Sequence, residues 1–67
     1  MSIKLNGREH ELSADIQNVA QLLGSLSLEN RIVIVELNKE IISKSAYADQ
    51  PVRDGDKVEL VHFVGGG

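Results

Sequence analysis

The sequence contains no cysteine, and among its 67 residues it has one proline, one tyrosine and one phenylalanine. Without cysteine the chain has no thiol nucleophile, no side-chain persulfide, no disulfide and no thiolate zinc site. A chain of this length buries only about 60% of the surface that its unfolded form exposes. Because no disulfide can support so thin a core, regular secondary structure must stabilise the domain.

Long apolar runs are also missing, and residues 1–4 lead directly into an alternating pattern. The sequence therefore predicts neither a signal peptide nor a membrane span, and we expect a cytoplasmic protein. Seven basic and ten acidic residues give a formal net charge of −3, and the basic residues are scattered. Nucleic acid is not an expected partner. The acidic excess is better explained by solubility than by docking to a basic partner.

The N-terminal part of the sequence alternates with a period of two, as strands do. Ile3 and Leu5 point to one face of a first strand, and residues 8–12 form a second. Between them stand Asn6 and Gly7, the dipeptide that closes a tight hairpin. We predict a two-stranded antiparallel hairpin.

A helix is predicted after the hairpin. Residues 13–15 offer capping side chains, and Gly24 can end the helix. Between them, apolar residues recur at the spacing that one buried face of a helix requires. These residues are Ile16, Val19, Leu22 and Leu23.

The second half of the sequence predicts further strands. Residues 31–36 are apolar on both faces and β-branched at the centre, which indicates a strand in the interior of a sheet. The remaining segments are, in order, a turn at 37–40, a short strand from 41, a helical turn at 43–48 around Tyr47, a turn at 53–56 and a last strand at 57–64.

This order of elements predicts the α+β class, with four to five strands in one mixed sheet and one main helix packed on one face. The helix can act as a crossover after the first hairpin, so the first and last strands are expected to be parallel neighbours. This is a β-grasp sheet. We expect the domain to span residues 1–64, with a flexible glycine tail at residues 65–67.

Side chains that could perform catalysis are few. Carboxylates occur in pairs at strand or turn spacing, without a partnering histidine or a set of metal ligands. Each histidine stands alone and is better explained as half-buried and structural. We therefore predict no metal, no cofactor and no catalytic side chain among the candidates, which are Glu9, Glu11, Asp54, Asp56, His10 and His62.

The glycines at the end of the sequence, Gly65, Gly66 and Gly67, offer a different chemistry. A run of glycine is narrow and can enter a slot that excludes other residues. The carboxylate expected on Gly67 is ionised at neutral pH and is a poor electrophile, so a partner must activate it, for example as a mixed anhydride with AMP. The alternative is a frayed terminus without function. The apolar strand before the glycines, and the absence of a competing site, favour a working tail.

The residues described so far resemble the ThiS family of sulfur carriers over essentially the whole chain. The likeness rests on Asn6-Gly7, on residues 32–36 and 38–42, on the Asp-Gly-Asp turn at 54–56, and on residues 61–67 with their terminal Gly-Gly. The resemblance implies a ubiquitin-like β-grasp protein of thiamin (thiazole) biosynthesis. Such a protein is a co-substrate and not an enzyme.

The resemblance also implies a role for the terminal pair, which maps onto Gly66 and Gly67. The Gly67 carboxylate would be adenylated by an E1-like, ThiF-like adenylyltransferase and then converted to a thiocarboxylate with sulfur from a persulfide donor. The thiocarboxylate would deliver sulfur to a ThiG-like thiazole synthase. Gly66 would give the carboxylate flexibility and access. Gly65 extends the tail, and the resemblance carries no essential role over to it; that it contacts partners is our own expectation.

A docking surface is expected beside the tail. On the last strand Val61 and Phe63 alternate with residues that lean toward the helix, which leaves both on the open face of the sheet. We predict that they contact partners. The alternative for Phe63 is that it simply closes the sheet.

Two other functions remain open from the sequence. A sulfur carrier of molybdopterin synthesis shares the fold, the tail and the thiocarboxylate chemistry. A ubiquitin-like modifier or a plain interaction module would use the tail for isopeptide bonds or not at all.

Overall fold

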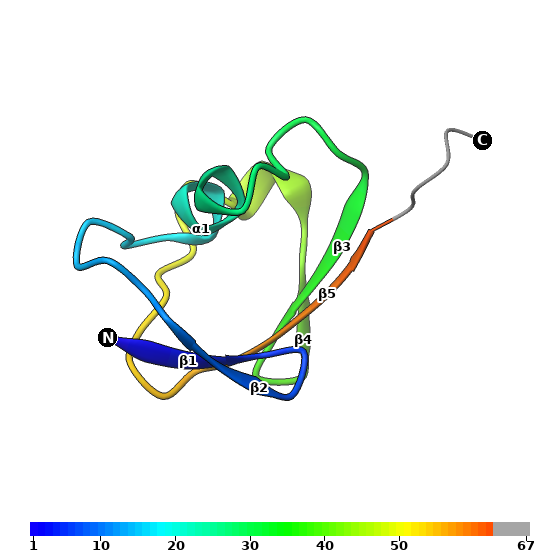
Figure 1. Ribbon diagram of the computed structural model, residues 1–67. Coiled ribbons are helices and arrows are strands. Elements are labelled where there is room, and N and C mark those ends of the chain that lie inside the picture. Colours follow the sequence, from blue (N-terminus) through cyan, green and yellow to red (C-terminus); the bar gives the residue numbers. More distant parts are fainter. Residues whose placement is uncertain (63–67) are drawn as a thin grey trace.

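The computed structural model describes residues 1–62. They form a single sheet, one α-helix and a short 3₁₀ turn (Figure 1). In chain order the elements are β1 (Ser2–Leu5), β2 (Arg8–Glu11), α1 (Val19–Ser25), β3 (Val33–Leu37), β4 (Glu40–Ile42), η1 (Lys44–Ala46) and β5 (Lys57–His62).

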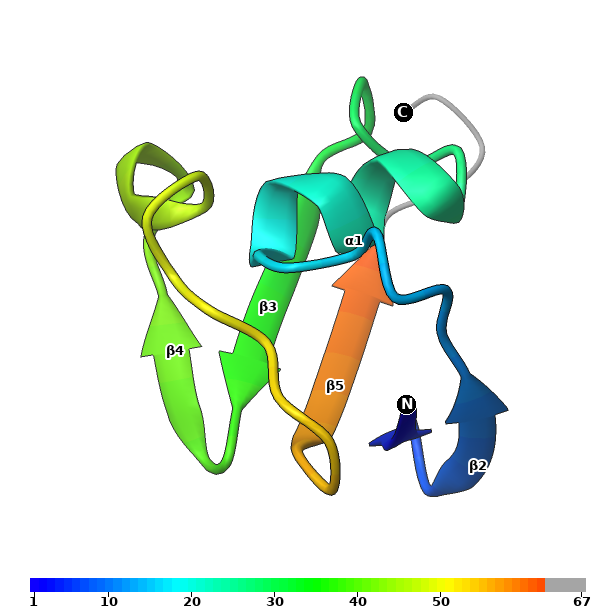
Figure 2. The same cartoon turned by 90° about the vertical axis from the view of Figure 1, so that its left-hand side faces the viewer.

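The sheet is mixed and has five strands in the order β2-β1-β5-β3-β4. β1 and β5 run parallel, whereas the pairs β1–β2, β3–β5 and β3–β4 are antiparallel. Figure 2 shows α1 lying across one face of the sheet, over β3 and β5. These findings confirm the predicted α+β arrangement and the predicted parallel pairing of the first and last strands.

The hydrophobic core lies between α1 and this face of the sheet. Alternation along each strand directs every second side chain toward the helix. On β5, for example, Val58 and Leu60 are buried. The buried apolar residues are Ile3, Leu12, Val19, Leu22, Leu23, Val35, Leu37, Val52, Val58 and Leu60.

Both hairpins close with two residues of positive φ, the pattern of a type I′ turn. Asn6 and Gly7 have φ of 50° and 83°, and Asn38 and Lys39 have φ of 49° and 73°. Asparagine tolerates the left-handed region better than most residues, which explains its place at the first position of each turn. The predicted turns at residues 6–7 and 37–40 are confirmed.

The predicted start of the helix is wrong. α1 begins at Val19, and its N-cap is Asn18, whose side-chain oxygen accepts a hydrogen bond of 2.8 Å from the Gln21 N–H. Residues 13–15 belong to a turn in which the Ile16 N–H donates to the Ser13 carbonyl at 3.0 Å. Ile16 therefore packs against the core from the loop before the helix.

The helix also ends beyond the residue expected to stop it, because Gly24 lies inside α1. The chain turns at Ser27, which has a φ of 60°. The Ser27 N–H donates to the Gly24 carbonyl at 3.1 Å and the Leu28 N–H to the Leu23 carbonyl at 2.8 Å. These are the two hydrogen bonds of a Schellman motif, with serine at the position that glycine usually occupies.

The expected interior position of residues 31–36 is confirmed in part. β3 lies between β5 and β4, as an interior strand should. However, α1 covers one face only, so Ile34 on the opposite face stays 44% exposed. Ile32 precedes the strand and is 75% exposed. Among residues 1–62 no helix is long and apolar enough to cross a membrane.

Candidate functional site

β5 is the strand that leads toward the predicted tail, and it occupies the centre of the sheet. Its side chains alternate as expected, since Leu60 is buried against the core while Val61 is 56% exposed. The predicted placement of Val61 on the open face is therefore confirmed. Phe63, Gly65, Gly66 and Gly67 lie outside the described residues, and their roles stay predictions.

Three exposed apolar residues, one of them Val61, lie on the open face of the sheet. Val61 lies opposite Ile34 on β3, and on the next strand Ile41 lies opposite Glu36. Ile34, Ile41 and Val61 are all exposed, and we call them the open-face patch. Exposed apolar side chains that gather on one surface commonly mark an interaction site.

Two acidic residues lie directly beside the open-face patch. Glu36 on β3 and Glu59 on β5 are register partners, and both alternate onto the open face with Ile34 and Val61. Like charges opposite each other in a sheet are mildly destabilising, so the pair does not stabilise the fold. It gives the border of the patch a negative charge.

Ile34 and Ile41 were missed by the sequence reasoning. The apolar run at residues 31–36 predicts an interior strand, and residues 41–42 predict a short strand, but neither pattern by itself marks a surface. A signal was present, since the prediction of a single main helix leaves one face of the sheet without cover. Apolar residues on that face could have been identified as a surface patch.

Two asparagine side chains bind β5, one at its first residue and one in its second half. Asn38 accepts a hydrogen bond of 2.9 Å from the Lys57 N–H and donates one of 3.1 Å to Asp56. Asn6 accepts a hydrogen bond of 2.7 Å from the Leu60 N–H and donates one of 3.2 Å to the Leu60 carbonyl. Each asparagine belongs to one of the hairpin turns.

The carboxylates considered from the sequence make local structural contacts. Asp54 accepts a hydrogen bond of 2.7 Å from the Ser2 N–H, and Asp56 accepts one of 2.8 Å from the Arg53 N–H. Glu9 accepts a hydrogen bond from the Ser2 hydroxyl. Their interpretation as turn and surface residues is therefore confirmed. In residues 1–62 no group of three potential metal ligands comes together.

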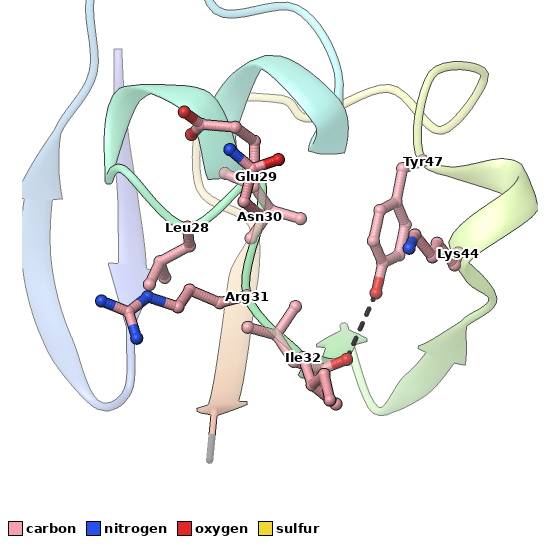
Figure 3. Close-up of a pocket in the computed structure, with 9 residues that line it drawn as sticks. Leu28, Glu29, Asn30, Arg31, Ile32, Lys44 and Tyr47 are labelled. Carbon is pink, nitrogen blue, oxygen red and sulfur yellow. Dashed lines mark hydrogen bonds between the residues drawn. The ribbon is translucent and has the colours of Figure 1, made fainter. Parts of the chain in front are cut away.

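A hollow of about 310 Å³ opens beside the start of β3 (Figure 3). Leu23, Leu28 and Tyr47 are among the residues that line it. The Tyr47 hydroxyl points to the Val33 carbonyl at 3.5 Å, which is long for a hydrogen bond. Figure 3 shows the Arg31 guanidinium directed away from Tyr47. The hollow thus presents no paired nucleophile and base among the described residues that line it.

The comparisons with known proteins agree on one family. The model of the ThiS family matches residues 3–67. The sulfur carrier protein ThiS of Bacillus subtilis (strain 168) is 49% identical over 65 residues, which cover 97% of this chain and 98% of that protein. A crystal structure of the thiamine biosynthesis protein ThiS from Geobacter metallireducens superposes with a TM-score of 0.83 at 36% identity, with both chains covered completely.

A longer protein also contains a similar region. The thiazole synthase of Paramagnetospirillum magneticum (strain ATCC 700264 / AMB-1) is 49% identical over 67 residues. The match covers all of this chain but only 20% of that protein.

Proposed function

The chain belongs to the ThiS family, and on this premise we propose that it is a cytoplasmic sulfur carrier of thiamin (thiazole) biosynthesis whose reacting group is the carboxylate of Gly67. It acts as a protein co-substrate and not as an enzyme. The observation that carries the proposal is the 49% identity to a sulfur carrier over almost the full length of both chains. The position of β5 in the centre of the sheet supports the proposal, because the strand that leads to Gly67 is held between two neighbouring strands.

The chemistry begins with activation of the Gly67 carboxylate by an E1-like, ThiF-like adenylyltransferase. A carboxylate oxygen attacks the α-phosphate of ATP, and pyrophosphate leaves. A persulfide sulfur of the donor then attacks the acyl carbon, and AMP leaves, which gives an acyl disulfide. A second thiolate attacks the donor's sulfur of that disulfide and releases the thiocarboxylate. All thiols come from partners, because this chain contains no cysteine.

The thiocarboxylate is the form that serves the next enzyme. It is ionised at neutral pH and its sulfur is a better nucleophile than the oxygen of the parent acid. It therefore delivers sulfur to a ThiG-like thiazole synthase. The occurrence of a region similar to this chain within a thiazole synthase supports this partner.

Partner enzymes dock on the open face of β5 and on the tail. Val61 contributes through its exposed side chain, and Ile34 extends the same apolar surface on β3. In this proposal Phe63 and Gly65 continue the contact toward Gly66 and Gly67, which enter the partner's active site. The domain then ends at residue 64, and residues 65–67 form the tail.

The test is intact mass spectrometry of the full chain after incubation with a ThiF-like enzyme, ATP and a persulfide donor. The expected product is heavier by the difference between one sulfur and one oxygen atom, located at Gly67. Covalent conjugates to other proteins would indicate a modifier instead. An unchanged mass with a partner that loads another ThiS protein would contradict sulfur carriage.

Copurification separates the two kinds of sulfur carrier. The proposal predicts association with a thiazole synthase when the protein is isolated from its own cells. Stoichiometric association with the large subunit of a molybdopterin synthase would assign the chain to the other pathway.

A further inference from the structure

The two halves of β5 are bonded differently on their β1 side. β1 pairs with β5 through the register Lys4↔Lys57 and Leu5↔Val58, and the chain then turns away at Asn6. β5 nevertheless continues to His62, where it still pairs with Val33 of β3. The second half of β5 therefore lies beside a backbone strand on the β3 side alone.

The side chain of Asn6 takes the place of the missing strand. Its oxygen accepts the Leu60 N–H at 2.7 Å and its nitrogen donates to the Leu60 carbonyl at 3.2 Å. One amide thus satisfies both polar groups of a residue 54 positions away in the sequence. The backbone of Asn6 continues the ladder just before this point, since its N–H donates to the Val58 carbonyl at 2.9 Å.

We infer that Asn6 is a positioning residue, which holds the second half of β5 in one place so that Val61 is presented to partner enzymes in a fixed geometry. The inference rests on the proposed function. Leu60 is buried, and Val61 follows it directly on the open face. If the backbone at Leu60 is held less firmly, the Val61 side chain that the adenylyltransferase must recognise therefore moves as well.

The effect is expected in binding rather than in chemistry. Without the Asn6 amide, the β1 side of Leu60 loses both hydrogen bonds, and this part of β5 occupies its docked position for only part of the time. The partner's apparent affinity then falls in proportion to the fraction of chains in the docked position, so KM rises. Once bound, the segment is ordered again, so kcat should be preserved.

Asn38 supplies a matched control at the opposite end of the same strand. It also makes two side-chain hydrogen bonds, to the Lys57 N–H and to Asp56. Its φ of 49° equals that of Asn6 within one degree. Glycine accepts this backbone geometry without strain, so Asn6→Gly and Asn38→Gly each remove two hydrogen bonds and leave the turn intact.

The experiment measures thiocarboxylate formation on the full chain by a ThiF-like enzyme with ATP and a persulfide donor, at carrier concentrations that span KM. For Asn6→Gly we expect KM to rise about fivefold while kcat changes less than about twofold. For Asn38→Gly, KM and kcat should both stay within about twofold of the values for the unsubstituted chain. Asn6→Asp keeps the acceptor for the Leu60 N–H but loses the donor, so its KM should lie between these values.

Backbone ¹⁵N relaxation provides a readout that needs no partner. The order of the Val61 amide on the picosecond-to-nanosecond timescale should fall in Asn6→Gly and stay unchanged in Asn38→Gly. Equal KM values for the two glycine variants, or an unchanged Val61 amide in both, would overturn the inference. If the unsubstituted chain is not loaded at all, the proposed function fails instead, and the two failures are thereby distinguished.

Discussion

Ile34 and Val61 lie directly opposite each other on neighbouring strands, and both side chains point away from the helix. This pair is the centre of the open-face patch. Since neither residue belongs to the buried core, burial does not account for their apolar character. β-branched residues favour strands, so the fold accounts for part of this choice, and in the proposed function a partner surface accounts for the rest.

Replacement of Val61 by threonine should weaken docking without unfolding the protein. The shape stays the same, but a hydroxyl enters the interface, and its burial without a partner costs about 1–3 kcal/mol. We expect the affinity for the adenylyltransferase to fall about tenfold. The free energy of unfolding should change by less than about 0.5 kcal/mol, because Val61 is exposed.

Ile41→Thr is the control for Val61→Thr, since Ile41 is 72% exposed but lies on the edge strand β4. Its effect on affinity, measured by calorimetry with the same enzyme, should be smaller. A larger effect at Ile41 than at Val61 would move the docking surface to the edge of the sheet.

Deletion of Gly67 should abolish sulfur loading. The reacting carboxylate would then belong to Gly66 and would end one residue short of the partner's active site. The buried core of the described residues ends at Leu60, so the urea midpoint should stay unchanged. Mass spectrometry would show the outcome, and full loading of the shortened chain would disprove the role of Gly67.

Truncation of the core beneath α1 should destabilise the domain strongly. Leu22 is completely buried, and Leu22→Ala removes its contacts and leaves a cavity, at a cost of about 2–5 kcal/mol. This is a large part of the roughly 3–10 kcal/mol expected for a domain of this length. Urea unfolding measures the change, and Ile41→Ala, at an exposed site, should alter stability by less than about 0.5 kcal/mol.

The N-cap of the helix can be tested with two substitutions at one position. Asn18→Ala removes the acceptor of the Gln21 N–H and should lower stability by about 1 kcal/mol. Asn18→Ser keeps an acceptor and should lower it much less. Equal losses in thermal unfolding would show that the side-chain bond contributes little and that other features fix the helix start.

The other end of the helix offers two stabilising changes. Gly24 lies inside α1, and a Cβ atom there would meet nothing within 4 Å, so Gly24→Ala should add about 0.5–1 kcal/mol. Ser27 has a φ of 60°, and Ser27→Gly should add about 0.5 kcal/mol by relieving the left-handed strain. A loss of stability in Gly24→Ala would contradict its unstrained place inside the helix, and a loss in Ser27→Gly would contradict the assigned Schellman motif.

The sequence predicted what local chemistry determines. Asn6-Gly7 specifies its turn almost alone, and alternation along residues 57–61 was enough to place Val61 outside. The helix boundaries depend on contacts from elsewhere in the chain. The Val19 N–H donates to the Gln50 carbonyl and the Val52 N–H to the Gln17 carbonyl, both at 3.0 Å. These bonds hold residues 17–19 beside residues 50–52, so the helix begins at Val19 and the side chains at residues 13–15 do not cap it.

The missed parts of the site have a similar cause. Exposure of Ile34 follows from the number of layers in the fold and not from its neighbours in sequence. The contact between Asn6 and Leu60 joins residues 54 positions apart, and an Asn-Gly pair gives no sign that its side chain has a second task. Both features depend on the order of the strands in the sheet.

The sheet order also has a kinetic consequence. β5 comes last among the five strands in the sequence but lies in the middle of the sheet, where it joins the β1–β2 hairpin to the β3–β4 hairpin. Each hairpin can form early from local contacts, whereas the insertion of β5 requires the closure of long loops and should be slow. Ile34 and Val61 become neighbours only in that late step. In the proposed function, an enzyme that recognises this pair would therefore bind only chains in which β5 has already taken its place.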